Sequence, residues 1–191
     1  ETANGAVVNF AGGPFTLETG YASGGAGFVG VASGTPTING TLNSTLGFTN
    51  GDCYGALTLT PAGLLQIGGT TMKYIGVSLT NAGTIQAKTA IDTSGQTVVN
   101  NNGTVAGDVL MGSASTFNNN AGGTLYSGAR FQGDLVNAGT LNPGGPGVYM
   151  TTSLTGTLNN TGVYRPDLDF GGHNSDFIAV SGASVFSGTV N

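Results

Sequence analysis

The stretch Leu79-Thr80-Asn81-Ala82-Gly83-Thr84-Ile85 decides the fold, because variants of it recur along the chain. Its clearest copies are Val99–Val105, Leu135–Leu141 and Leu158–Tyr164, with a weaker copy at Leu59–Leu65. The glycines that mark the repeats are Gly40, Gly63, Gly83, Gly103, Gly123, Gly139, Gly162 and Gly182. Successive markers are 23, 20, 20, 20, 16, 23 and 20 residues apart. A period near twenty with turn residues in every copy predicts a solenoid of stacked coils.

Aliphatic residues keep fixed positions relative to these glycines. Two residues after the markers stand Leu42, Leu65, Ile85, Val105, Leu125, Leu141 and Tyr164, and the last copy has Ser184 with Val185 beside it. Four residues before the markers stand Leu59, Leu79, Val99, Leu135, Leu158 and Ile178. Asn119 interrupts the second column, and Phe117 is the nearby candidate to fill it. Because even spacing keeps side chains on one face of an extended chain, stacking predicts an aliphatic core.

Asparagine occupies a third fixed position, two residues before the markers, at Asn81, Asn101, Asn137 and Asn160. Two explanations are open. Stacked inside the solenoid, the amides would donate and accept along its axis and would satisfy backbone groups of the turns. Alternatively, asparagine is there only because it tolerates the left-handed conformation of turns.

The composition agrees with stacked short strands. The chain has 36 Gly among 191 residues and only 7% charged residues, so we expect many tight turns in which Gly and Asn supply positive φ. No apolar stripe with helical spacing persists over eleven residues, so we expect almost no helix. A coil of about twenty residues has room for about three short strands. Roughly eight coils at about 4.8 Å each would form a rod on the order of 40 Å long.

Two regions are expected to depart from the regular repeat. Residues 1–37 are glycine-rich, and we predict irregular or edge coils there. The step from Gly123 to Gly139 is the shortest, so we expect local distortion, with the marker displaced to Gly122. Both ends of such a stack would carry open backbone edges, which leads us to expect that the natural chain continues.

Charge and cysteine content exclude several function classes. The net charge is −5, and the four basic residues, Lys73, Lys88, Arg130 and Arg165, are scattered, which argues against nucleic acid as a partner. Cys53 is the single cysteine, so an intrachain disulfide framework and multi-cysteine metal motifs are excluded. We predict that Cys53 is a small buried hydrophobic residue rather than a nucleophile, because its neighbour Asp52 would oppose a thiolate.

Candidate catalytic and metal-binding groups gather near residues 165–178. The stretch 171–178 approximates one copy of the calcium-binding nonapeptide GGxGxDxUx, but that site needs consecutive copies. His173, Ser175 and Asp176 have the residue types of a hydrolytic triad, although adjacency in sequence is no sign of one. We interpret this stretch as a turn into a strand at 177–180.

Asp167 and Asp169 alternate along one strand face, with Arg165 beside them. A pair of carboxylates could cleave a glycosidic bond on a β-helix, yet paired exposed acids are usually only solvated. Asp108 and Asp134 each follow a glycine and are interpreted as entries from a turn into a strand. We therefore predict no catalytic residue, no metal ligand and no cofactor.

The C-terminal third resembles a known family. The stretch Asn137–Gly147 is similar to the N-x-G-T-L-x-P-G turn of autotransporter passenger domains. The elements that follow in that family match Ser153–Leu158, then the acidic strand Tyr164–Phe170, then the S-D-x-[LIF]-x-V-x-G element at Ser175–Gly182. Order and spacing agree over roughly residues 133–191. The upstream coils share only their general Asn-Gly-Thr character with the family.

The resemblance implies a right-handed parallel β-helix that a Gram-negative bacterium secretes through its outer membrane with the help of the protein's own C-terminal β-barrel. It also implies a chaperone-like β-helical cap, whose position residues 140–191 fit. Because neither barrel nor signal peptide is in this sequence, we expect an internal passenger fragment. The expected organisation is one continuous solenoid, with N-terminal coils at 1–37, regular coils at 38–140 and a cap at 141–191.

For function we therefore expect an adhesive, non-enzymatic stalk on the bacterial cell surface. Its expected partner is a ligand of host cells or extracellular matrix, with self-association as a further possibility. The alternatives are a polysaccharide lyase or hydrolase that uses Arg165, Asp167 and Asp169, and a scaffold with no binding activity of its own. The C-terminal coils of the adhesive stalk would also aid folding of the passenger during secretion.

Overall fold

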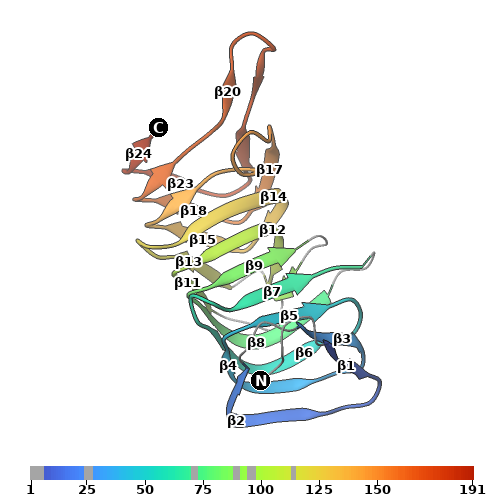
Figure 1. Ribbon diagram of the computed structural model, residues 1–191. Helices are drawn as coiled ribbons and strands as arrows, with labels where there is room; N and C mark the ends of the chain where they lie inside the picture. Colours follow the sequence, from blue (N-terminus) through green and yellow to red (C-terminus); the bar gives the residue numbers. More distant parts are fainter. Residues whose placement is uncertain (1–6, 24–27, 70–72, 88–90, 94–97, 113–114) are drawn as a thin grey trace.

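The structure is a computed structural model that describes residues 7–23, 28–69, 73–87, 91–93, 98–112 and 115–191. Within these ranges every regular element is a β-strand, and there is no helix. Parallel strands stack one above another into an elongated β-solenoid, with the N-terminal coils at one end and the C-terminal coils at the other (Figure 1). This confirms the predicted all-β parallel β-helix with coils of about twenty residues.

The strands lie on three faces of the solenoid, and the coils before residue 73 have described strands on two of these faces only. The first face contains β1 (Val7–Ala11), β3 (Phe28–Ser33), β5 (Thr45–Phe48), β7 (Leu64–Ile67), β9 (Thr84–Ala87), β16 (Thr140–Leu141), β19 (Val163–Tyr164) and β24 (Thr189–Val190). The second face contains β10 (Ile91–Thr93), β17 (Thr151–Thr155) and β22 (Phe177–Val180). The third face contains β2 (Thr16–Ser23), β4 (Thr37–Leu42), β6 (Cys53–Leu59), β8 (Lys73–Asn81), β11 (Val98–Asn101), β13 (Thr116–Asn119), β15 (Asp134–Asn137), β18 (Leu158–Asn160) and β23 (Ser184–Phe186).

Two long strands turn the corner from the first face to the second. They are β12 (Thr104–Met111) and β14 (Thr124–Gln132), and their register shifts between Gly107 and Val109. Gly107 has a φ of 120°, which a residue with a side chain rarely adopts, so it permits the bend. The start of β8 likewise pairs with β10 on the second face, where Lys73 is 1% exposed.

The core consists of aliphatic columns that run along the axis. On the first face the paired residues are Val8, Val29, Leu46, Leu65, Ile85, Val105, Leu125, Leu141, Tyr164 and Val190, of which Val8 and Val190, at the two ends, are exposed. On the third face they are Gly40, Leu57, Leu79, Val99, Phe117, Leu135, Leu158 and Ser184. Phe117 therefore fills the place that Asn119 left open, as predicted, and packs edge-on against Phe131.

The asparagines form a ladder inside the solenoid. Asn81, Asn101, Asn119, Asn137 and Asn160 stand in register on the third face, and all five are 0% exposed. Each of the first four donates its Nδ2 hydrogen to Oδ1 of the next, at 2.7, 2.7, 2.6 and 2.5 Å. Among the described non-glycine residues only His173 has a positive φ, so the explanation from left-handed turns is wrong. The inward ladder is confirmed, and it includes Asn119.

The marker glycines are required by close packing rather than by positive φ. Twelve described glycines have a positive φ, as the composition led us to expect, but none of the markers from Gly63 to Gly182 is among them. Instead, a Cβ on Gly83 would overlap the carbonyl oxygens of Gly63 and Thr60, and one on Gly103 would overlap that of Gly83. The turns of successive coils thus lie directly on one another, which excludes a side chain.

Some predicted column positions are wrong because two turns are longer than the others. Leu59 pairs with Asn81, not with Leu79, since the turn after Leu59 has two more residues than the turn after Asn81. Leu42 pairs with Leu59, and Ser44 rather than Gly40 occupies the marker position of its coil. The turn after Asn119 is longer in the same way, so the distortion lies there while Gly123 remains the marker.

The N-terminal end fits one of the two expectations for residues 1–37. In its described part, β1, β2 and β3 pair with the coils above them, so this region forms edge coils rather than irregular chain; residues 1–6 and 24–27 lie outside the described part. At the other end, an antiparallel hairpin of β20 (Leu168–Asp169) and β21 (Asn174–Ser175) projects past the last coil (Figure 1). This insertion moves the last marker from Gly182 to Gly188 and places Ile178 on the second face, opposite Thr152.

Removing one ladder amide should cost far more stability than removing an outer amide of the same strand. Asn119→Ala takes away the donor to Asn137 and the acceptor of Asn101, both buried, so we expect a loss of about 2–4 kcal/mol in the free energy of unfolding. Asn118→Ala removes one half-buried bond to Asn100 and should cost less than about 1 kcal/mol. Urea denaturation of both variants checks this, and equal losses would contradict the ladder's structural role.

Candidate functional site

Two outward-facing columns form an extended uncharged surface of the solenoid. On the third face, beside the asparagine ladder, the column is Thr41, Thr58, Thr80, Asn100, Asn118, Val136, Asn159 and Val185. On the first face, the column includes Thr84, Thr104, Thr124 and Thr140. We call these two columns the Thr/Asn surface. It offers hydroxyl and amide groups and contains no charged residue.

The Thr/Asn surface is held by cross-strand hydrogen bonds of its own. Asn118 Nδ2 donates to Asn100 Oδ1 at 3.1 Å. In the adjoining turns, Asn120 Nδ2 donates to Asn102 Oδ1 at 2.9 Å. Stacked coils thus align equivalent polar side chains on the outside as well as inside, which fixes their spacing for a ligand that lies along the axis.

A shallow hollow of about 160 Å³ lies on the outside of β5 and β7. It is lined by Gly47, Phe48, Thr49, Gln66, Ile67, Gly68 and Gln86. The hollow arises because Gly47 has no side chain at the outward position that Gln66 and Gln86 occupy in the next coils. Gln66 Nε2 donates to Gln86 Oε1 at 3.4 Å along its wall. The hollow has polar amides but no charged group.

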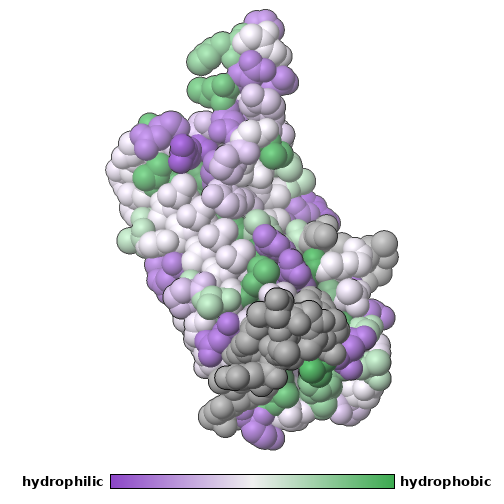
Figure 2. Space-filling model, viewed as in Figure 1, coloured by the Kyte–Doolittle hydropathy of each residue, from purple (hydrophilic) through white to green (hydrophobic). Residues whose placement is uncertain are grey.

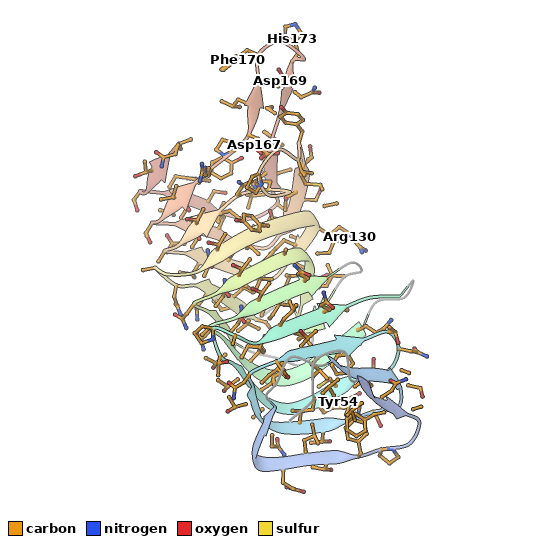
Figure 3. All side chains as sticks on the ribbon, in the orientation of Figure 1. Tyr54, Arg130, Asp167, Asp169, Phe170 and His173 are labelled. Atoms are coloured by element: carbon orange, nitrogen blue, oxygen red, sulfur yellow. The ribbon has the colours of Figure 1, made fainter. Side chains whose placement is uncertain are left out.

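The projecting hairpin carries two exposed apolar side chains, Leu168 and Phe170. Phe170 is 85% exposed and lies near the tip beside His173, while Asp167 lies at the base (Figure 3). Hydrophobic side chains cover one side of this projection (Figure 2). A second hollow, of about 280 Å³, is lined by Leu168, Asp169, Phe170, His173, Asn174 and Ser175.

Asp176 anchors the hairpin to the last coils. It is 5% exposed, and its carboxylate accepts hydrogen bonds from the backbone N–H of Met150 at 2.7 Å and of Asp167 at 2.8 Å. Burial, followed by the negative charge of Asp176, raises the pKa of the Tyr164 hydroxyl. Sequence reasoning missed this anchoring role, because the two donors come from segments that only the fold brings together.

The carboxylates considered for catalysis also bind backbone groups. Asp167 Oδ2 accepts from the N–H of Gly147, and Asp169 Oδ1 accepts from Gly171 at 3.0 Å and Gly172 at 2.9 Å. These bonds fix the loops around the hairpin rather than placing both acids against one substrate. Arg165 is exposed next to the hairpin base.

The triad and calcium candidates are not brought together either. His173 and Ser175 are exposed on the hairpin, whereas the carboxylate of Asp176 faces the amides of Met150 and Asp167. In the described part of the chain, no group of three or more His, Cys, Asp or Glu side chains could hold a metal ion. The predicted strand after this stretch is confirmed as β22.

Two further acids, Asp108 and Asp134, bind groups of a neighbouring coil. Asp134 begins β15, as predicted, and its Oδ1 accepts from the N–H and the hydroxyl of Thr157 at 2.9 and 2.8 Å. Asp108 lies inside β12 rather than at a strand entry, so that prediction is wrong. It forms an ion pair with Arg130, Oδ2 to Nε 2.9 Å, at the outside of the second face.

Cys53 is buried, with 1% exposure, at the start of β6. Burial raises the pKa of its thiol to about 12. The thiol therefore stays protonated in the folded state, which confirms the interpretation as a small hydrophobic residue.

Comparison of the chain with protein-family models, curated proteins and solved structures found no match. Within the described residues, no helix is long and apolar enough to cross a membrane.

The buried thiol predicts a loss of stability at alkaline pH. Above about pH 9 the unfolded chain releases the thiol proton while the folded chain keeps it, so the free energy of unfolding should fall by up to about 1.4 kcal/mol per pH unit until about pH 12. Denaturation between these pH values checks the slope, and Cys53→Ala should flatten it. An equal slope in both proteins would contradict this assignment.

Proposed function

We propose that this chain is a rigid β-helical stalk of a Gram-negative autotransporter passenger, displayed on the bacterial surface, where it adheres to host cells or extracellular matrix. The β-helix fold is compatible with such a stalk. The observation that carries the adhesive part is the Thr/Asn surface, which extends over many coils without a charged residue. The resemblance of residues 133–191 to passenger domains supports the secretion route.

The chemistry of this surface suits a ligand that is extended and uncharged. Hydroxyls and amides both donate and accept hydrogen bonds, and their spacing repeats with the coils. Without charges, binding depends little on long-range electrostatics, so adhesion should change little with ionic strength. The proposal includes no catalytic role, and the use of Asp167, Asp169 and Asp176 as acceptors of backbone N–H groups supports that view.

Carboxylates placed on the Thr/Asn surface should weaken adhesion. Thr80→Glu with Asn159→Glu introduces two charges at exposed positions of the third-face column, and each charge must lose water without gaining a partner. We expect binding of the purified chain to matrix proteins and host cells to fall about tenfold or more. Surface plasmon resonance and cell-binding assays would measure it.

The matched control carries the same two charges on the second face. Gln132→Glu with Ser153→Glu also alters exposed strand positions and should leave binding unchanged. Equal losses in both variants would show that charge alone matters. If the wild-type chain binds neither matrix proteins nor cells, the adhesive part is refuted and a scaffold remains.

The C-terminal coils should also protect the coils below them. Deleting residues 140–191 removes Asn160, the acceptor of Asn137, and uncovers Leu125 and Leu135, which are buried in the whole chain. We expect the upstream coils to become sensitive to protease. Replacing only residues 168–175 with a short Gly-Ser turn keeps the stack and should preserve resistance. Resistance after the large deletion would contradict a folding role.

A further inference from the structure

Four Asn-Gly dipeptides occur in the chain, at Asn4, Asn39, Asn50 and Asn102. In this dipeptide the glycine nitrogen can attack the asparagine side-chain Cγ, because glycine has no side chain to hinder ring closure. The reaction needs a mobile carboxamide and a free approach of the glycine nitrogen. The structure describes three of the four dipeptides and gives them different surroundings; Asn4 lies outside the described residues.

At Asn50 the two reacting groups already meet. Asn50 is exposed and lies in the link between β5 and β6, outside both strands. The N–H of Gly51 donates to Oδ1 of Asn50 itself at 3.0 Å, so the nucleophilic nitrogen lies next to the carboxamide it would attack. Rotation of this exposed side chain is enough to present Cγ instead of Oδ1.

In the other two described dipeptides, hydrogen bonds to other residues engage the groups that would react. Asn39 lies within β4, and its Oδ1 accepts from the N–H of Ala56 at 3.1 Å. At Asn102, Oδ1 accepts from Asn120, while the N–H of Gly103 donates to the ladder residue Asn101. Ring closure at either site would have to break these contacts.

We propose that Asn50 is a site of spontaneous covalent modification, converted through a succinimide to aspartate and isoaspartate in the folded protein. The backbone nitrogen of Gly51 loses its proton to hydroxide and forms a bond to Cγ of Asn50. The Cγ–Nδ2 bond breaks, and the leaving group takes up a proton to depart as ammonia. Water then opens the ring at either carbonyl, and no oxidant or reductant is required.

The modification alters the link between two coils. The isoaspartate product adds one carbon to the main chain at residue 50, two residues before Asp52, whose N–H donates to Gly34 O at 3.2 Å in the coil below. Either product also adds a carboxylate at residue 50. The change therefore affects the stacking and the charge of this turn while it leaves the asparagine ladder untouched.

The test follows the three described dipeptides in one sample of the intact folded chain. After incubation at mildly alkaline pH, peptide mapping by mass spectrometry measures conversion at Asn39, Asn50 and Asn102, and electron-transfer fragmentation identifies isoaspartate. We expect Asn50 to react at least about tenfold faster than either of the others, which corresponds to about 1.4 kcal/mol of activation free energy. The three rates should converge in denaturant, where the fold no longer distinguishes them.

Two variants complete the test. Asn50→Gln keeps the amide but requires a larger ring, so it should abolish the fast reaction, whereas Asn102→Gln should leave the rate at Asn50 unchanged. The proposal is overturned if Asn50 reacts no faster than Asn39 and Asn102 in the folded chain. It is also overturned if the same order of rates persists in denaturant, because local sequence would then explain it.

Discussion

The asparagine ladder on the third face is the interaction on which the regular part of the solenoid depends. Each of Asn81, Asn101, Asn119 and Asn137 donates to the next asparagine and also to a carbonyl oxygen of a nearby turn or strand. At Asn81 and Asn101, Oδ1 accepts in addition from the glycine N–H two residues on. Because a buried amide without partners is costly, such a network stabilises only the register in which every member is paired.

The ladder and the glycine turns require each other. The amides of Asn81 and Asn119 reach the carbonyls of Thr104 and Thr140 in the next coil because the glycine turns stack without side chains between them. Slipping one strand by one residue would turn its asparagine outward and its outward threonine or asparagine inward. The same register therefore sets the Thr/Asn surface on the outside, so the interior bonding pattern determines the spacing of the groups proposed to bind a ligand.

How far the sequence predicts this structure depends on the length of each turn. In coils where the first-face core residue is the fourth residue after the ladder position, as Ile85 is after Asn81, the repeat predicts the pairing correctly. The turns after Leu59 and Asn119 are longer, and a column counted from the glycine misplaces Leu59 and passes over Asn119. After a longer turn, the residues that pair with the next coil can be identified only from the pairing of the whole strands.

The candidate site, too, could be predicted from the sequence only in part. The low-charge surface rich in Thr and Asn is visible in the composition, but its arrangement into two columns needs the register. The partners of Asp176, the amides of Met150 and Asp167, come together only when the hairpin folds against the last coils, so no local pattern could indicate them. Likewise, the three described Asn-Gly dipeptides are alike in sequence and differ only in what the neighbouring coils bind.

The most direct measurement of the central claim is side-chain amide hydrogen exchange by NMR. If the ladder is continuous in solution, the carboxamide protons of Asn101, Asn119 and Asn137 should exchange as slowly as the backbone amides of the strands that flank them. The carboxamides of Asn102 and Asn120, which lie in the outer turns, should exchange quickly. Rapid exchange at Asn119, comparable to that of Asn120, would contradict the account.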